Sequence, residues 1–245
     1  MGKYVGQSVI RIDGPERVTG KTIYAPDIQF SDMLYGAVAR SSHAHALLKE
    51  IRTEKARRSP GVRAVITGDM LPYMFGSMIA DQPFLAKDRV RYNGEPIALV
   101  IAESELEAQM AADAIEASYE DLPAVFDVFE ALKDDAPLVH EDQHAYRRDP
   151  ARYPALDHTN ICNETSYELG DVEKAFAQAD HVFEHCFFSH PTSHCAMEPF
   201  GRVARYDAVT GPFTVWTHTD APHLSLGELA HFCTPEQETI RILPP

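Results

Sequence analysis

Residues 90–101 read VRYNGEPIALVI. The Asn93-Gly94 pair within this stretch signals a turn. The apolar run Ile97–Ile101 has the length of a strand, and its lack of alternation predicts a strand that is buried on both faces. A domain core is therefore expected around these residues.

The stretch that follows, residues 104–115, reads SELEAQMAADAI and has the period of a helix. Leu106, Met110, Ala111 and Ile115 fall close to one face, which we expect to pack on the core. Acidic residues at its start interact favourably with the positive end of the helix dipole. Further strands are predicted on both sides, over residues 34–40, 46–51, 62–67 and 117–120, with a short helix over 54–59 for which Thr53 can act as the cap.

These patterns divide the chain into four parts. Residues 1–21 form an extended lead-in, and residues 22–132 form one α+β domain. Residues 133–160 are polar and irregular, which predicts an interdomain linker that proteases cut first. Residues 161–245 begin a second domain, which is predicted to be incomplete because no closing element follows its last strand. In this part strands are expected over 163–169, 180–189, 201–207, 212–217 and 238–243, and helices over 172–179 and 224–232.

The composition excludes several functional classes. The 245 residues are 44% hydrophobic and 24% charged, and they contain no apolar run long enough to cross a bilayer. The first residues lack the apolar core of a signal peptide, so a cytoplasmic protein without a membrane partner is expected. The net charge of −15 opposes nonspecific nucleic-acid binding. Residues 94–142 hold fourteen acids and a single base, Lys133, which indicates either a solvated face or a docking surface for a basic partner.

The cysteines and histidines give no strong metal signal. The four cysteines are scattered without a C-x-x-C pair, which favours reduced thiols over a metal cluster. His181 and His185 are four residues apart, as are His190 and His194, and on a helix each pair would share a face. The sequence around them alternates, however, and on a strand such a pair lies roughly 13 Å apart. Histidines on the polar face of a sheet are therefore the favoured interpretation.

Two stretches near the end have the composition of a site. Residues 193–201 read SHCAMEPFG, in which Pro199 holds Glu198 extended and Met197 and Phe200 would shield its carboxylate from water. A carboxylate that only fixes a corner by hydrogen bonding to nearby backbone remains the alternative. Residues 216–223 read WTHTDAPH and run from a strand end into a helix, where ligands commonly bind. Thr219 or Asp220 could equally act there only as a helix cap.

Four motifs together resemble one known family. They are VTGK with YAPD at residues 18–27, GAVARSSHAHA at 36–46, VRYNGEPIALV at 90–100, and HCAMEPFG at 194–201. In this order they are similar to motifs of the molybdenum-binding large subunit of the xanthine dehydrogenase/aldehyde oxidase family. The resemblance implies an α+β fold in which an a/b hammerhead domain is followed by an incomplete molybdenum-cofactor-binding domain.

The resemblance also implies a chemistry. Family members hydroxylate an aldehyde or an N-heterocycle, or oxidise carbon monoxide, with water as the oxygen source. The molybdenum–molybdopterin cofactor is bound by the complete subunit, and iron–sulfur clusters and FAD lie on partner domains. The implied partners are the remainder of the molybdenum subunit, the iron–sulfur and FAD subunits, and a small-molecule substrate.

The departures from the family pattern limit what this chain can inherit. The family's glycine-rich loop at the metal and its glutamate base would lie beyond Pro245, so no catalytic residue and no metal ligand is assigned here. Thr219 and Asp220 are the inherited candidates for cofactor contact, and Asp220 stands where the family has glutamine. A carboxylate cannot donate a hydrogen bond unless it is protonated.

The resulting hypothesis is a partial or split large subunit of a molybdenum hydroxylase that is inactive as an isolated chain. A degenerate scaffold that docks partners without catalysis is the main alternative. A hydrolase that uses the histidines is a weaker one, because the sequence has no nucleophile-elbow pattern.

Overall fold

The computed structural model describes residues 4–207, 213–233 and 240–244. The chain divides into two compact units, which are described separately. The central unit comprises Asp32–His190, and the terminal unit combines Met1–Ser31 with Pro191–Pro245. Both mix helices and strands, as the α+β prediction requires.

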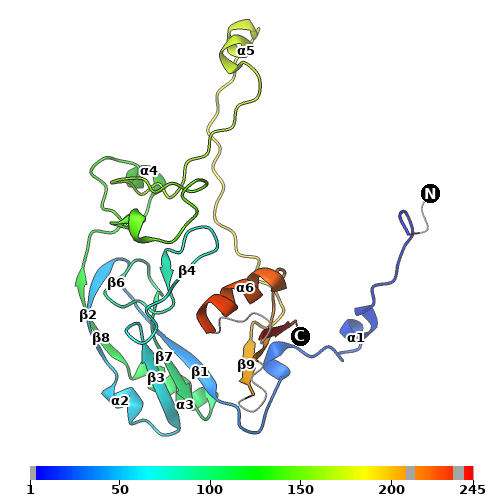
Figure 1. Ribbon diagram of the computed structural model, residues 1–245, viewed down its shortest axis with the longest axis vertical. Coiled ribbons are helices and arrows are strands. Elements are labelled where there is room, and N and C mark those ends of the chain that lie inside the picture. The colour runs from blue at the N-terminus through cyan, green and yellow to red at the C-terminus, as the bar shows by residue number, and fades with distance from the viewer. Residues whose placement is uncertain (1–3, 208–212, 234–239, 245) are drawn as a thin grey trace. The chain divides into compact units, whose positions relative to one another are not determined.

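The central unit is organised around β7 (Pro96–Ala102), the strand predicted from the apolar run. β7 lies between β1 (Tyr35–Arg40) and β3 (Val62–Thr67), and both neighbours are antiparallel to it (Figure 1). Four side chains of β7 are buried: Ile97, Ala98, Val100 and Ala102. β7 is hydrogen-bonded along both edges and has buried side chains on both faces, as predicted, while Leu99 and Ile101 are half-buried.

Two smaller sheets complete the strands of this unit. In the first, β2 (Ala46–Arg52) pairs with β6 (Arg89–Val90) and β8 (Glu116–Asp121), again antiparallel. In the second, β4 (Met74–Phe75) pairs with β5 (Gln82–Pro83). Ala46, Leu48 and Val90 join the same buried core as β7.

The helix α3 (Glu105–Asp113) packs on β1 and β7 with a different face from the one predicted. Its buried residues are Ala108, Ala111 and Ala112, while Leu106 and Met110 are 69% and 64% exposed. Small side chains allow the helix backbone to lie close to the sheet, so the larger side chains stay at the solvent side. Ser104 is the N-cap and accepts a hydrogen bond from the Glu107 amide.

The short helix α2 (Glu54–Arg57) forms where it was expected, but its predicted cap does not. The Thr53 hydroxyl accepts a hydrogen bond from Arg57 Nε at 3.0 Å and makes none to the helix amides. The chain then turns at Gly61, whose φ of +71° suits glycine.

Residues 128–162 of the central unit are tied together by side-chain amides. They include α4 (Val128–Ala131) and the 3₁₀ turn η2 (Gln143–Ala145). Gln143 Nε2 donates to the carbonyls of Thr159 and Ile161, at 3.0 and 2.9 Å. Asn160 Nδ2 donates to the carbonyls of Ala131 and Pro137, each at 3.1 Å. The stretch predicted as a linker therefore carries its own hydrogen-bonding network.

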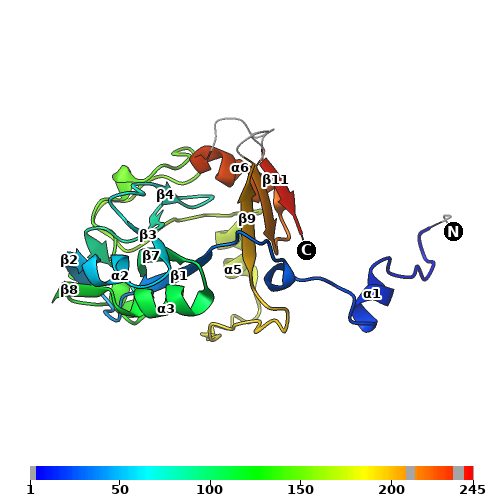
Figure 2. The same ribbon diagram turned by 90° about the horizontal axis from the view of Figure 1, so that it is seen from below.

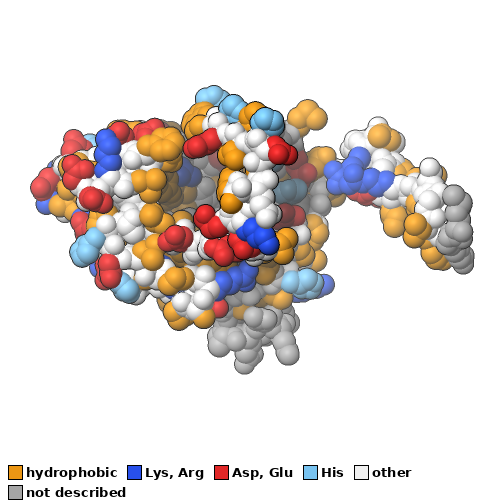
Figure 3. Space-filling model, turned by 90° about the horizontal axis from the view of Figure 1, so that it is seen from above, with side chains coloured by type: hydrophobic (Ala, Val, Ile, Leu, Met, Phe, Trp, Pro, Cys, Tyr) orange, Lys and Arg blue, Asp and Glu red, His pale blue; other side chains and the backbone are white. Residues whose placement is uncertain are grey.

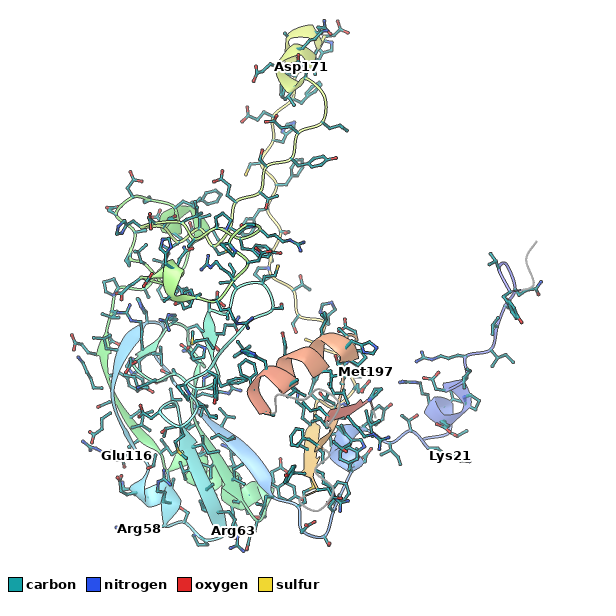
Figure 4. The ribbon with its side chains drawn as sticks, in the orientation of Figure 1. Lys21, Arg58, Arg63, Glu116, Asp171 and Met197 are labelled. Carbon is teal, nitrogen blue, oxygen red and sulfur yellow. The ribbon has the colours of Figure 1, made fainter. Side chains whose placement is uncertain are left out.

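An apolar arm, residues 163–190, follows this network. Its helix α5 (Val172–Gln178) begins at Asp171, which accepts a hydrogen bond from the Lys174 amide as the sequence indicates (Figure 4). The strands predicted over 163–169 and 180–189 are not formed. In Figure 1 the two flanking segments run to and from α5 as extended chain. Large apolar side chains along the arm are exposed, among them Tyr167, Leu169, Phe176, Phe183, Phe187 and Phe188.

The terminal unit holds a three-stranded sheet and a helix. β10 (Phe213–Thr217) is central, with β9 (Arg202–Tyr206) antiparallel and β11 (Ile240–Leu243) parallel to it. α6 (Pro222–Cys233) connects the parallel pair and packs on β11 (Figure 2). Ile240 is buried in this packing and Ile242 is half-buried. Residues 238–239 of the predicted last strand lie outside the described residues.

The N-terminal segment of the terminal unit, described from residue 4 to residue 31, contains α1 (Gly14–Val18) and the 3₁₀ turn η1 (Ala25–Asp27). η1 packs on β9, and Gly201, which directly precedes β9, lies close to Pro26 of η1. A Cβ built on Gly201 would lie 2.9 Å from the ring of Pro26. The terminal unit therefore needs glycine at this position.

The acid-rich segment 94–142 is partly neutralised in the fold. Six of its fourteen acids contact basic side chains: Glu103, Glu116, Glu120, Asp121, Glu130 and Glu141. A seventh, Glu95, is buried. Figure 3 likewise shows acidic side chains lying beside lysine and arginine side chains. The segment is thus closer to a mixed, solvated surface than to a uniformly acidic one.

Candidate functional site

The candidate site begins where β10 ends. Thr217 is the last residue of the strand and is buried, and α6 begins at Pro222 after a connection of four residues, 218–221. β10 is the central strand, and α6 leads on to the parallel strand β11. The carboxyl end of such a strand, just before its crossover helix, is a common position for ligands.

Thr219 and Asp220, the predicted cofactor contacts, lie in this connection. The Thr219 hydroxyl accepts a hydrogen bond from the Ala221 amide at 3.1 Å and shares another with Ser225 Oγ at 3.2 Å. Asp220 is exposed. Thr219 therefore stabilises the start of α6, while the Asp220 carboxylate faces solvent and can accept hydrogen bonds from a ligand.

The structure brings the two predicted site stretches together. His218 Nδ1 lies 3.3 Å from Glu198 Oε1, and the His218 ring lies edge-on to Phe200 at 6.0 Å. The Glu198 side chain is 27% exposed and that of His218 is 55% exposed. Their contact could not be predicted from the sequence, because it depends on how residues twenty apart pack around β9 and β10.

The expected shielding of Glu198 is wrong. Met197 is 99% exposed and Phe200 is also exposed, so neither covers the carboxylate. His218 is the partner of Glu198 instead. Cys195, in the same segment, has a φ of +45°, a left-handed conformation that few residues other than glycine adopt.

Trp216 precedes this connection and packs against Phe30 of the N-terminal segment. Its ring lies 5.5 Å from that of Phe30, and the Arg205 guanidinium lies 4.9 Å above Phe30. Trp216 is half-buried.

The motif at residues 90–96 has a structural role in the central unit. Glu95 is buried, and its carboxylate accepts a hydrogen bond from the Arg91 amide. Burial raises the pKa of Glu95 above its ordinary value, although the Arg91 amide and charge oppose the shift. The Ser41 amide donates to the Glu95 carbonyl at 2.9 Å, which fastens the Asn93-Gly94 turn to the loop after β1.

The histidine pairs do not converge. His181 and His185 are exposed in the apolar arm, each near a phenylalanine ring. Among the described residues no three His, Cys, Asp or Glu side chains are grouped as a metal site would require. Within the described residues, no helix is long and apolar enough to cross a membrane.

Comparison with known proteins decides the family. Residues 19–123 match the a/b hammerhead domain of aldehyde oxidase and xanthine dehydrogenase, and residues 155–245 match the molybdopterin cofactor-binding domain. The chain belongs to the xanthine dehydrogenase/aldehyde oxidase family. Its α+β fold is thus a hammerhead domain followed by cofactor-domain sequence.

Relatives in this family are named for different activities. The chain is 36% identical to the nicotinate dehydrogenase large molybdopterin subunit of Eubacterium barkeri, over 99% of this chain and 54% of that protein. It is 34% identical to the carbon monoxide dehydrogenase large chain of Afipia carboxidovorans, over 87% of this chain and 27% of that one.

Solved structures of the family share the fold. Cu,Mo-CO dehydrogenase matches with a TM-score of 0.83 and 30% identity, over 98% of this chain and 31% of that chain. Quinoline 2-oxidoreductase from Pseudomonas putida 86 matches with a TM-score of 0.81 and 30% identity, over 98% and 30%. The chain therefore spans about half of the nicotinate dehydrogenase subunit and less than a third of the other proteins named here.

The site residues fit a molybdopterin group only in part. The exposed Asp220 carboxylate suits N–H donors, such as those on the edge of a pterin ring. The same carboxylate does not suit an oxo ligand of the metal, because both are hydrogen-bond acceptors. Any cofactor role of Asp220 therefore lies on the organic part of the group.

Proposed function

We propose that this chain supplies the N-terminal part of the large subunit of a molybdenum hydroxylase. In this proposal residues 22–132 form the hammerhead domain and residues 161–245 begin the cofactor domain, with 1–21 as lead-in and 133–160 as linker. The complete enzyme hydroxylates an aldehyde or an N-heterocycle, with water as the oxygen source. The two family matches and their order along the chain support this assignment.

The exposed apolar arm is the main observation that supports the proposal. Residues 163–190 lie wholly within the stretch that matches the family's cofactor domain, and they carry several large apolar side chains. Yet Phe183 and Phe187 are exposed, and neither flanking segment pairs with another described strand. Large exposed apolar patches mark surfaces that another polypeptide covers. We assign this surface to the remainder of the molybdenum subunit.

The remaining cofactor assignments follow from the same proposal. Thr219 and Asp220 would lie against the pterin, Thr219 by shaping the start of α6 and Asp220 by accepting its N–H groups. When bound, the molybdenum–molybdopterin group supplies two-electron oxidation chemistry. Iron–sulfur clusters and FAD on partner subunits would carry the electrons away. The isolated chain is proposed to be inactive.

Co-expression tests the proposal. The chain is produced in molybdenum-sufficient cells, alone and with the C-terminal part of a related large subunit, and metal is measured by mass spectrometry. We expect no stoichiometric molybdenum in the isolated chain and recovery of molybdenum in the copurified pair. Stoichiometric molybdenum or aldehyde oxidation by the isolated chain would contradict the proposal. A stable pair that never gains molybdenum would favour the non-catalytic scaffold.

A further inference from the structure

Residues 124–137 of the central unit, here named the α4 surface, line an open groove of about 440 Å³ beside α4. Four large apolar side chains in this stretch are more than half exposed: Phe126, Val128, Phe129 and Leu132. Val128 and Phe129 lie four and three residues before Leu132, so all three share one face of this helical turn. Apolar residues that are exposed singly are ordinary, whereas an exposed apolar patch marks an interaction site.

The backbone of the α4 surface is ordered. At its start His45 Nδ1 donates a hydrogen bond to the Pro123 carbonyl at 2.6 Å. Asp127 caps α4 by accepting hydrogen bonds from two amides of the first turn, at 2.8 and 3.1 Å. Asn160 donates to two carbonyls of the stretch, as described above. The apolar side chains are therefore exposed on a fixed backbone, so binding a partner would cost little conformational entropy.

The α4 surface also carries more acid than its own base neutralises. Three acidic residues and one basic residue line the groove: Asp127, Glu130, Asp135 and Lys133. Lys133 forms an ion pair with Glu130. Asp134 and Asp135 are exposed, and neither takes part in an ion pair within the described residues. A net negative charge therefore remains beside the apolar patch, and it favours a positively charged partner.

We propose that the α4 surface binds a basic, amphipathic segment of a partner polypeptide. Large apolar side chains of this segment contact Phe126 and Phe129, and its lysine or arginine side chains pair with Asp134 and Asp135. A polypeptide suits the surface better than a small cation does, because the exposed apolar side chains extend beyond the groove and aromatic residues are enriched at protein interfaces. The proposal rests on the central unit alone and is independent of the proposed cofactor chemistry.

Two model peptides of about 18 residues, or about five helical turns, test the surface on the full chain. Both carry leucine on one helical face, and the other face is lysine in one peptide and glutamate in the other. Fluorescence anisotropy measures binding at about 0.15 M ionic strength, where charges more than about 8 Å apart are largely screened. We expect the lysine peptide to bind at least about tenfold more tightly. Equal affinities, or no binding of the lysine peptide at about 0.1 mM, would overturn the proposal.

Two pairs of charge reversals locate the binding. Asp134→Lys combined with Asp135→Lys should weaken binding of the lysine peptide at least about tenfold and strengthen binding of the glutamate peptide. Glu164→Lys combined with Glu168→Lys is the matched control, because these exposed acids lie in the apolar arm and the net charge changes equally. The control should keep the wild-type preference. The same loss in both double variants, or in neither, would overturn the proposal.

A second pair of variants tests the apolar contact. Phe129→Ser should weaken binding of the lysine peptide about tenfold, because it removes an aromatic side chain from the patch. Phe187→Ser, in the apolar arm, should leave the affinity unchanged. Both phenylalanines are exposed, so both variants should fold, which circular dichroism checks. Wild-type affinity in the Phe129 variant would overturn the proposal, because charge alone would then account for the binding.

Sedimentation without peptide distinguishes a partner from a second copy of this chain. We expect the wild type and the double variant of Asp134 and Asp135 to have the same oligomeric state. A wild-type dimer that this double variant abolishes would assign the α4 surface to a second copy and would overturn the proposal of a basic partner.

Discussion

β7 is apolar throughout, and the segment 180–189 carries the large apolar residues Val182, Phe183, Phe187 and Phe188 among polar ones, yet only β7 forms a strand. β7 has a hydrogen-bonded neighbour on each edge, and Val100 at its centre is fully buried. In the apolar arm Phe187 is 89% exposed. The difference teaches that apolar patterning creates the capacity for a strand, and that neighbouring strands decide whether the strand forms.

The largest expected effect is the loss of stability that a buried charge at the centre of β7 would cause. Val100→Asp should destabilise the central unit by about 4 kcal/mol or more, because the carboxylate would be buried without a partner. Phe187→Asp in the apolar arm should change stability by less than about 0.5 kcal/mol. Urea denaturation followed by circular dichroism measures both. A large loss in the Phe187 variant would show that the arm is packed after all.

A second expected effect is a loss of stability when the close contact between Gly201 and Pro26 is disturbed. Gly201→Val should destabilise the terminal unit by about 1–3 kcal/mol, because its side chain would overlap the Pro26 ring. Trp216 is the only tryptophan in the chain and lies in this unit, so its fluorescence reports unfolding there. Gly14→Ala is the matched control, since a Cβ at Gly14 makes only ordinary contacts. Similar behaviour of the two variants would contradict this packing.

A smaller effect depends on pH and concerns Glu95. Its raised pKa means that the unfolded chain loses this proton at lower pH than the folded chain does. Wild-type stability should therefore fall as pH rises from the ordinary glutamate pKa to the raised folded value, and this loss should then stay constant. Glu95→Gln does not titrate, so its stability relative to wild type should rise over the same window.

The smallest expected difference is in where a protease first cuts the native chain. The sequence predicts first cuts within 133–160, whereas the amide network of Gln143 and Asn160 protects much of that stretch. We expect the first cuts in the apolar arm, at residues 180–190, where side chains are exposed and no regular structure forms. Mass spectrometry of the early fragments separates the two outcomes. First cuts within 133–160 would support the linker prediction.

Local patterns predicted most elements of the central unit correctly. Strands such as β3 and β7 are short, rich in apolar residues and bounded by turns, so neighbouring residues suffice to locate them. The buried face of α3 was missed because Leu106 and Met110 suggested burial by hydrophobicity alone, whereas close packing on the sheet selected the alanines. The strands of the arm were overpredicted because sequence pattern does not reveal whether a pairing partner is present.

The sequence predicted the location of the candidate site but not the contacts within it. Its location between β10 and α6 followed from the strand-to-helix order of residues 216–223. The contact of Glu198 with His218 required the antiparallel pairing of β9 and β10, which no spacing in the sequence reveals.

Hydrogen–deuterium exchange of the isolated chain tests most directly the claim that the apolar arm lacks its partner. Our account predicts strong protection of amides in β7 and near-unprotected exchange over residues 163–169 and 180–189. It further predicts that the arm gains protection when the C-terminal part of a related large subunit is copurified with the chain. Protection of the arm as strong as that of β7 in the isolated chain, or no gain in the copurified pair, would contradict the account.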